Sequence, residues 1–312
     1  MTTISVIVPV YNDRDGLTAT VHSLLEQEYP ADGYEILVVD NGSTDDTQQV
    51  LIRYKKKFSC SFLYEIEKNP GAAIARNRIV RKSDSEIIAF IDDDVKVEKE
   101  WLSALVEAYR RWPNASAVGG KANLVFEGPC PYWVQAKERQ RLSEIDLGNK
   151  MMLLSADQTL YSLNLSFRKK AFNQWGLFRE DLDRKGDRLL NGGETELLKR
   201  FQKKGAKIYY DPAMSVNHYV FSSRLKKAWF LRRSYWSGRT RVRVSFYDDG
   251  VRPGFEIREI VQLGKSTGSF LYHLLRDGFE SDAVYRSAEI ICLLWGVVVE
   301  KVKLCFEKIS QT

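Results

Sequence analysis

Several signatures that would place this chain in a familiar class are absent from its sequence. Its 312 residues include four cysteines, at positions 60, 130, 292 and 305, and no two of them form a CxxC pair. This spacing argues against a zinc ribbon or a thioredoxin-type site and is typical of a protein in a reducing compartment. No GxGxxG follows the first predicted strand, and no GxxxxGK[ST] occurs, so a dinucleotide dehydrogenase and a P-loop NTPase both fit poorly.

Long apolar runs are also missing. The nearest candidate, Ile290 to Val299, is well short of the ~18 residues needed to cross a bilayer. It predicts a buried helix, with a helix lying in the membrane interface as the alternative. The first residues enter an apolar run without a basic region, so we expect no signal peptide. We therefore expect a cytoplasmic protein, with a place at the inner face of the cell membrane as a further option.

What is present is an ordinary globular composition, with 44% hydrophobic and 28% charged residues. This excludes a disordered, collagen-like or disulfide-scaffold chain and allows one large domain or two small ones. The net charge of +6 is uneven, because the segment from Phe221 to Tyr247 holds eight basic residues and no acidic one, which leaves −2 for the rest. These residues are Arg224, Lys226, Lys227, Arg232, Arg233, Arg239, Arg241 and Arg243. The charge predicts a local anion-binding segment.

The first half of the sequence alternates strand and helix patterns. Buried strands are predicted at 4–10, 35–39, 61–66 and 86–91, with helical apolar spacing between them. Such alternation predicts a mostly parallel sheet with right-handed crossovers. The second half is less regular: a strand is expected near 161–167, helices at 170–175 and 194–203, and a short strand at 207–210. After His218 the chain becomes helical, and 248–254 reads as a linker.

Polar residues follow three of the predicted strands, where ligands bind in open α/β sheets. Tyr11-Asn12-Asp13 follows the first, Asp40-Asn41-Gly42-Ser43 the second, and Asp92-Asp93-Asp94 the fourth. We expect all three to meet at one crevice. Adjacent carboxylates repel one another unless a cation lies among them, so the aspartate run favours a Mg²⁺ or Mn²⁺ site over a solvated acidic turn.

Two further residues have more than one interpretation each. Asp40 either accepts a hydrogen bond from a base or ribose, or caps the following helix, a task that Ser43 or Thr44 could perform equally well. Arg76 lies on a helix that begins near Gly71 and pairs with a phosphate, with one of the aspartates, or with a surface acid.

At this point the sequence resembles a known family. The segments VIVPVYN, VVDNGSTDDT, GAAIARN, FIDDDV, LNLSFRK and GGETELLKR occur in the order and at the intervals of the family 2 glycosyltransferases with a GT-A fold. The resemblance covers about Ile4 to His218. It implies a GT-A (Rossmann-like) domain over 1–220, a mixed, mostly parallel sheet flanked by helices, with a basic and aromatic helical extension over 221–312.

The resemblance also implies a nucleotide-sugar donor, commonly a UDP-sugar, and Mn²⁺ or Mg²⁺. Residues that match the family's motifs would line the nucleotide site: Pro9, Tyr11, Asp40, Arg76 and Asp92. Asp92 and Asp94 match the DxD-type motif, with Asp94 as the more direct metal ligand. A bound metal would neutralise charge on the leaving diphosphate. His218 matches a histidine that the family often has near the metal, although a lone histidine is more often structural.

The GGETELLKR segment departs from the family pattern. Aligning Thr195 and Glu196 with the family's Thr-Glu places Glu194 at the general base, where an aspartate is usual, and Gly193 where an acid usually precedes it. Glu194 would take the proton of an acceptor hydroxyl, and the reaction would invert the anomeric configuration. The alternative role for Glu194 is a charge that favours the helix dipole. Glu196 is expected only to pair with Arg200.

The acceptor side is the least determined. Asn164 matches a family segment beside the sugar and acceptor cleft, and Trp236 lies among the basic residues of the C-terminal segment. That segment would hold a saccharide or lipid-linked acceptor at an anionic membrane, close over the donor diphosphate, or be a solvated helix face. No motif indicates nucleic acid. The alternatives to a transferase of polysaccharide biosynthesis are an inactive nucleotide-sugar-binding protein and a nucleotidyltransferase.

Overall fold

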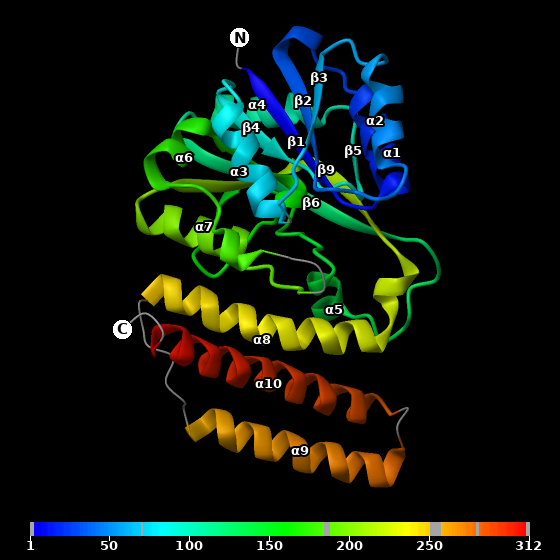
Figure 1. Cartoon of the computed structure of the whole chain (residues 1–312), viewed down its shortest axis with the longest axis vertical. Coiled ribbons are helices and arrows are strands. Elements are labelled where there is room, and N and C mark those ends of the chain that lie inside the picture. Colours follow the sequence, from blue (N-terminus) through cyan, green and yellow to red (C-terminus); the bar gives the residue numbers. More distant parts are fainter. Residues whose placement is uncertain (1–2, 70, 184–187, 250–256, 279–280, 310–312) are drawn as a thin grey trace. The chain divides into compact units, whose positions relative to one another are not determined.

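The computed structural model describes residues 3–69, 71–183, 188–249, 257–278 and 281–309 (Figure 1). Within these residues, nine strands form one sheet in the order β3-β2-β1-β4-β8-β6-β9-β5, and β7 pairs with β9. The strands are β1 (Ile4–Val10), β2 (Tyr34–Asp40), β3 (Ser61–Ile66), β4 (Ile87–Phe90), β5 (Val95–Val97), β6 (Ala115–Phe126), β7 (Met152–Leu153), β8 (Leu165–Arg168) and β9 (Lys207–Val220). The α-helices are α1 (Arg14–Leu25), α2 (Thr47–Lys55), α3 (Ala72–Lys82), α4 (Trp101–Arg111), α5 (Ala136–Arg141), α6 (Lys169–Trp175), α7 (Gly193–Lys203), α8 (Lys227–Asp249), α9 (Ile257–Asp277) and α10 (Asp282–Ile309).

The predicted strands of the first half are all present and parallel. β1 pairs with β2 and with β4, and β2 pairs with β3. Every residue of β1 and β4 is buried, as expected for strands covered on both faces. The apolar runs therefore form the middle of the sheet, and their carboxyl ends meet at one edge. The second half adds antiparallel pairs, β4 with β8 and β6 with β8, so the sheet is mixed as predicted.

Of the two longest strands, β6 was not predicted, and β9 was predicted only over 207–210. β6 contains a Gly119-Gly120 pair, and β9 contains Pro212, both of which discourage a strand assignment. The structure explains the glycine pair and the proline, because the register of β6 against β9 shifts between Gly120 and Lys121. A Cβ atom on Gly120 would lie 1.8 Å from the carbonyl oxygen of Met214. The glycine is therefore required by the close approach of two backbones at this irregularity.

The chain divides into two compact units. The sheet unit consists of residues 1–127, 139–180 and 193–220, and the helical unit consists of residues 128–138, 181–192 and 221–312. The sequence placed a boundary at 220, but it gave no sign that two earlier segments belong with the C-terminal helices. Of the linker expected at 248–254, the first two residues end α8, and the remainder lies outside the described residues.

The helical unit is built around the pairing of α8 with α10, beside which α9 lies (Figure 1). Gly238 and Gly296 let the two helix backbones approach closely: a Cβ on Gly296 would lie 1.9 Å from the carbonyl oxygen of Tyr235. Between the helices, the fully buried carboxylate of Glu300 accepts hydrogen bonds from Arg239 and Arg243. No described helix is both long enough and apolar enough to cross a membrane.

Candidate active site

Three loops meet at the carboxyl edge of the parallel strands, as the sequence predicted. The backbone N–H of Tyr11 donates to Asp93 Oδ2 at 3.3 Å, which joins the loop after β1 to the loop after β4. The backbone N–H of Asn12 donates to Ser43 Oγ at 2.9 Å, and Asn12 Oδ1 accepts from the backbone N–H of Thr44 at 2.7 Å. Asn12 adopts a left-handed φ of 51°, which asparagine tolerates better than most residues. The loops therefore form one connected rim.

Asp40 ends β2 beneath this rim. Its side chain is fully buried, and Oδ1 accepts a hydrogen bond from the backbone N–H of Ser43 at 2.8 Å. Within the described residues Oδ2 has no hydrogen-bond partner. Buried carboxylate oxygens are rarely left without one, so this atom is suited to a donor on a ligand. Pro9 is buried within β1, whereas the ring of Tyr11 is 56% exposed and offers a face for stacking.

Asp92, Asp93 and Asp94 lie in the turn between β4 and β5. Burial raises the pKa of Asp93 well above its usual value, and the neighbouring carboxylates of Asp94, Asp13 and Asp92 raise it further. Burial also raises the pKa of Asp92, with the charge of Arg76 opposing this effect. Partial burial is the largest cause of both shifts, and the neighbouring negative charges add to it, so the turn favours a cation or a proton.

Arg76 is the centre of the polar cluster. It projects from α3 and is buried, and Nη2 lies 3.2 Å from Asp92 Oδ1. Nη1 lies 3.2 Å from Oε1 of Glu194, which is in the first turn of α7. Of the partners the sequence left open for Arg76, the structure shows an aspartate, and it adds Glu194. The predicted general base and the predicted donor-side aspartate are thus held by one guanidinium.

Asp94 and His218 form a second pair. The β5–β9 register sets Val95 opposite His218, and the backbone N–H of Tyr219 donates to the carbonyl oxygen of Asp94. His218 Nε2 lies 3.3 Å from Asp94 Oδ2, and both side chains are almost fully buried. A carboxylate and an imidazole are both ligands that Mn²⁺ accepts, so Asp94 and His218 would hold such an ion. Among the described residues no group of three or more acidic, histidine or cysteine side chains is arranged for a metal.

The structure gives Asn164 a different task from the expected contact with the acceptor. Its side chain is fully buried, its amide nitrogen donates to the carbonyl oxygens of Lys121 and Met214, and its amide oxygen accepts from Trp101 Nε1 at 3.0 Å. The amide has no hydrogen left for a substrate, so Asn164 braces the fold instead. Trp236 is buried in the helical unit with the guanidinium of Arg239 4.7 Å from its ring centroid.

The sequence prediction for the basic segment also needs correction. Arg233, Arg239 and Arg243 are wholly or largely buried in the helical unit, and Arg233 donates to the carbonyl oxygen of Leu189. Lys227 pairs with Asp282 at 2.9 Å. Half of the eight basic residues are therefore occupied by packing among the helices. The run does not form a single cationic surface.

Sequence reasoning missed the side of α1 that supports the aspartate turn. Thr20 Oγ1 donates to the carbonyl oxygen of Asp93 at 2.9 Å, and Ser23 Oγ accepts from the backbone N–H of Val97. Gln27 Nε2 donates to the carbonyl oxygen of Glu98 at 2.7 Å. The available signal was two polar residues, Thr20 and Ser23, at positions i and i+3 of a helix with apolar neighbours, whereas Gln27 follows the end of α1.

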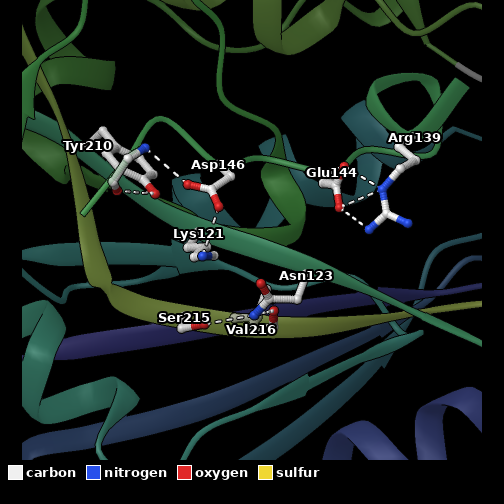
Figure 2. A network of polar contacts seen from close by, with 9 residues as sticks. Lys121, Asn123, Arg139, Glu144, Asp146, Tyr210, Ser215 and Val216 are labelled. Carbon is white, nitrogen blue, oxygen red and sulfur yellow. Dashed lines mark hydrogen bonds and ion pairs between the residues drawn. The ribbon is translucent and has the colours of Figure 1, made fainter. Parts of the chain in front are cut away.

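A polar network braces the loop that follows α5 against β6 and β9 (Figure 2). Lys121 Nζ lies 2.8 Å from Asp146 Oδ2, and Asn123 Nδ2 donates to Ser215 Oγ at 3.1 Å. Tyr210 donates from its hydroxyl to the carbonyl oxygen of Gly148. This network contains none of the predicted site residues. A cavity of about 460 Å³ likewise lies elsewhere, at the amino ends of β1, β2 and β3.

Comparison with known proteins is consistent with this geometry. Among solved structures, the mannosyltransferase PcManGT from Pyrobaculum calidifontis, in complex with GDP-Man and Mn²⁺, matches with a TM-score of 0.56 at 18% identity, over 99% of this chain and 75% of that one. Staphylococcus aureus TarS 1–349, in complex with UDP-GlcNAc, matches with a TM-score of 0.55 at 15% identity, over 97% and 92%. The fold is therefore that of the GT-A glycosyltransferases.

The family follows from the sequence comparisons. The model of glycosyl transferase family 2 matches residues 5–173, more than half of the chain, so the protein belongs to glycosyl transferase family 2. A curated relative, the glucosyl-dolichyl phosphate glucuronosyltransferase of Haloferax volcanii, is 26% identical over 248 residues, which cover 76% of each chain. The fold and family predicted from the motifs are confirmed.

Proposed function

We propose that this glycosyltransferase moves a sugar, with inversion, from a nucleotide-diphosphate sugar to a hydroxyl of a saccharide or lipid-linked acceptor during polysaccharide biosynthesis. The observation that carries the proposal is the shared contact of Arg76, which holds Asp92 and Glu194 in one cluster. An acid that faces the donor and a base that faces the acceptor must lie close together for a direct displacement.

In this mechanism Glu194 acts as the general base. Its carboxylate accepts the proton of the acceptor hydroxyl as the hydroxyl oxygen forms a bond to the anomeric carbon. The bond from that carbon to the diphosphate oxygen breaks on the opposite face, and the nucleotide diphosphate leaves. Arg76 holds the carboxylate in one orientation through its contact with Oε1. Gly193 provides no second acid, and a single carboxylate is enough for this one displacement.

We propose that the donor is a UDP-sugar bound against Tyr11, Pro9 and Asp40. The orphan oxygen of Asp40 supports this, because it can accept a hydrogen bond from the base or ribose. Mn²⁺ or Mg²⁺ would be held by Asp94 and His218, with Asp92 nearby. When bound, the metal would supply a Lewis acid to the diphosphate. The neighbour structure with UDP-GlcNAc supports a UDP-sugar, and the one with GDP-Man and Mn²⁺ supports a nucleotide-sugar donor with a metal.

For the acceptor we propose a lipid-linked saccharide at the inner face of the cell membrane, in line with the dolichyl phosphate named for the Haloferax volcanii relative. The helical unit supports membrane contact through exposed apolar side chains on α9 rather than through the basic segment. Leu271, Tyr272 and Leu275 are 51%, 58% and 89% exposed. Side chains of this kind insert at the headgroup boundary.

The first test is kinetic. The purified protein is assayed against a panel of UDP- and GDP-sugars with Mn²⁺, and Glu194→Gln is compared with the wild type. We expect turnover to fall by about 10²–10⁴, with calorimetric binding of the donor retained. Full turnover in Glu194→Gln, or no nucleotide binding with metal present, would contradict the proposal. The anomeric configuration of the product, read by NMR, tests inversion separately.

Membrane contact has its own test. Co-sedimentation with vesicles containing anionic lipid should fall when Leu271 and Leu275 are replaced by glutamate. The control is Gln262→Glu, which adds a negative charge at another exposed position of α9. Equal losses in both variants would indicate a simple charge effect and would rule out insertion of the leucines.

A further inference from the structure

Ser162 makes a contact that neither the motifs nor the family match assigns. It lies in a short 3₁₀ turn, Ser162–Asn164, immediately before β8. Its side chain is almost fully buried, and Oγ donates to Glu194 Oε1 at 2.6 Å. A serine hydroxyl that donates to a carboxylate at this distance forms a charge-assisted hydrogen bond. Ser162 is 32 residues from Glu194 in sequence, so the fold alone brings them together.

The turn that carries Ser162 is rigidly held. Asn164 donates from its amide to the carbonyl oxygens of Lys121 on β6 and Met214 on β9, and it accepts from the indole of Trp101 on α4. Three separate elements therefore fix the backbone two residues away from Ser162. The hydroxyl is presented to Glu194 from a position that packing has already determined, as a preorganised site requires.

Both donors to Glu194 use the same oxygen. Ser162 Oγ lies 2.6 Å from Oε1, and Arg76 Nη1 lies 3.2 Å from Oε1. Among the described residues, no hydrogen bond ends on Oε2. Two donors on one oxygen hold the carboxylate plane in one orientation and occupy the lone pairs of that oxygen. The other oxygen keeps its capacity to accept a proton.

We infer that Ser162 is a positioning residue that, together with Arg76, reserves Oε2 of Glu194 as the atom that takes the proton of the acceptor hydroxyl. The inference rests on the proposed role of Glu194 as the base. The proton moves from the acceptor hydroxyl to Oε2, the hydroxyl oxygen bonds to the anomeric carbon, and the nucleotide diphosphate leaves with the electron pair. Ser162 keeps its own proton throughout and has no direct contact with substrate.

The test compares Ser162→Ala, Ser162→Thr and Ser166→Ala. Ser166 is a matched control, because it is a fully buried serine on the adjoining β8 whose hydroxyl donates to the carbonyl oxygen of Val118 instead. For Ser162→Ala we expect kcat to fall about tenfold, the loss typical of a hydrogen bond to a charged group, with the KM and calorimetric Kd of the donor unchanged. Ser162→Thr keeps the hydroxyl and should recover most of kcat. Ser166→Ala should keep the wild-type kcat.

A double-mutant cycle separates positioning from a general structural effect. Aspartate at position 194 is one methylene shorter and loses the hydroxyl of Ser162, so Ser162→Ala should have little further effect on the kcat of Glu194→Asp. Equal losses in both backgrounds, or a Ser162→Ala enzyme within twofold of the wild type, would overturn the inference while leaving Glu194 as the base. Full activity of Glu194→Gln would instead overturn the proposed function itself.

Discussion

Each of the two units contains a cluster in which arginine side chains pair with carboxylates. The ratio of arginines to carboxylates in one cluster is the reverse of that in the other. In the sheet unit, one guanidinium, that of Arg76, is shared by Asp92 and Glu194. In the helical unit, one carboxylate, that of Glu300, is shared by Arg239 and Arg243. Each cluster meets the rule that buried charges are paired. The two clusters differ in the other charged and titratable groups that lie beside them.

The helical cluster is balanced by a second acid, since Arg243 Nη1 also lies 3.6 Å from Asp181 Oδ2. Two positive and two negative groups then fix how the helices pack. The sheet cluster instead gains Asp94, which lies beside the imidazole of His218. Carboxylates gathered at the carboxyl edge of the parallel strands, beside an imidazole, can bind a metal or take a proton. The surroundings of a buried cluster, a strand edge in one unit and a helix interface in the other, thus separate a reactive site from a structural one.

Replacing Arg76 with methionine should have the largest effect. It leaves Asp92 and Glu194 without their shared cation, so we expect kcat to fall at least about 100-fold. The free energy of unfolding should fall by about 3 kcal/mol. Steady-state kinetics and thermal melting measure the two effects. Arg78→Met on the same helix is the control for kcat, because Arg78 pairs with Glu65 and Glu67 instead of Asp92 and Glu194, and its kcat should stay near the wild-type value.

Glu300→Leu tests the helical cluster in the same way. Removing the carboxylate leaves two buried guanidinium groups without it, and we expect a loss of about 3 kcal/mol in unfolding free energy. Below the melting temperature kcat should stay near the wild-type value, since the cluster has no catalytic task. Adding Arg239→Met and Arg243→Met to this variant should restore much of the lost stability. A fall in kcat that matches Arg76→Met would refute the distinction between the clusters.

The difference between these clusters is also where sequence reasoning reached its limit. The fold of the first half could be predicted because each buried strand is a short, continuous apolar run, such as Ile4–Val10, followed by polar residues. The site residues could be named because they follow such strands or match motifs. An aspartate partner for Arg76 was among the expected ones, but its contact with Glu194 could not be predicted, because the two residues are 118 positions apart in sequence.

Long-range contacts explain the other errors as well. Arg239 and Arg243 read as an anion-binding run because Glu300, which neutralises them, lies in a different helix. β6 was missed because its glycine pair is required by a neighbouring strand rather than by local conformation. Asn164 was placed at the acceptor because nothing in the sequence reveals that Lys121 and Met214 take both hydrogens of its amide and that Trp101 donates to its oxygen.

The close contact of α8 with α10 should be sensitive to a single methyl group. A Cβ at position 296 would lie 1.9 Å from the carbonyl oxygen of Tyr235, so Gly296→Ala must push the helices apart. We expect a cost of about 1–3 kcal/mol. Gly268→Ala in α9 is the control, because nothing lies within 4 Å of its Cβ position, and alanine should there stabilise the helix by up to about 1 kcal/mol. Opposite signs in thermal melts are the expected result, and equal signs would contradict the packing.

The smallest effect is expected at the pair of Lys121 and Asp146, whose side chains are 26% and 50% exposed (Figure 2). The Lys121 ammonium and the backbone N–H of Gly148 lower the pKa of Asp146. A lowered pKa in the folded state stabilises the protein above the unfolded value, near 4, and this stabilisation disappears as the pH falls through the folded value. Lys121→Met should therefore cost under about 1 kcal/mol at pH 7 and almost nothing in strong acid, with a smaller loss in high salt. A cost as large as that of Arg76→Met would mean that exposure to solvent does not weaken the pair of Lys121 and Asp146.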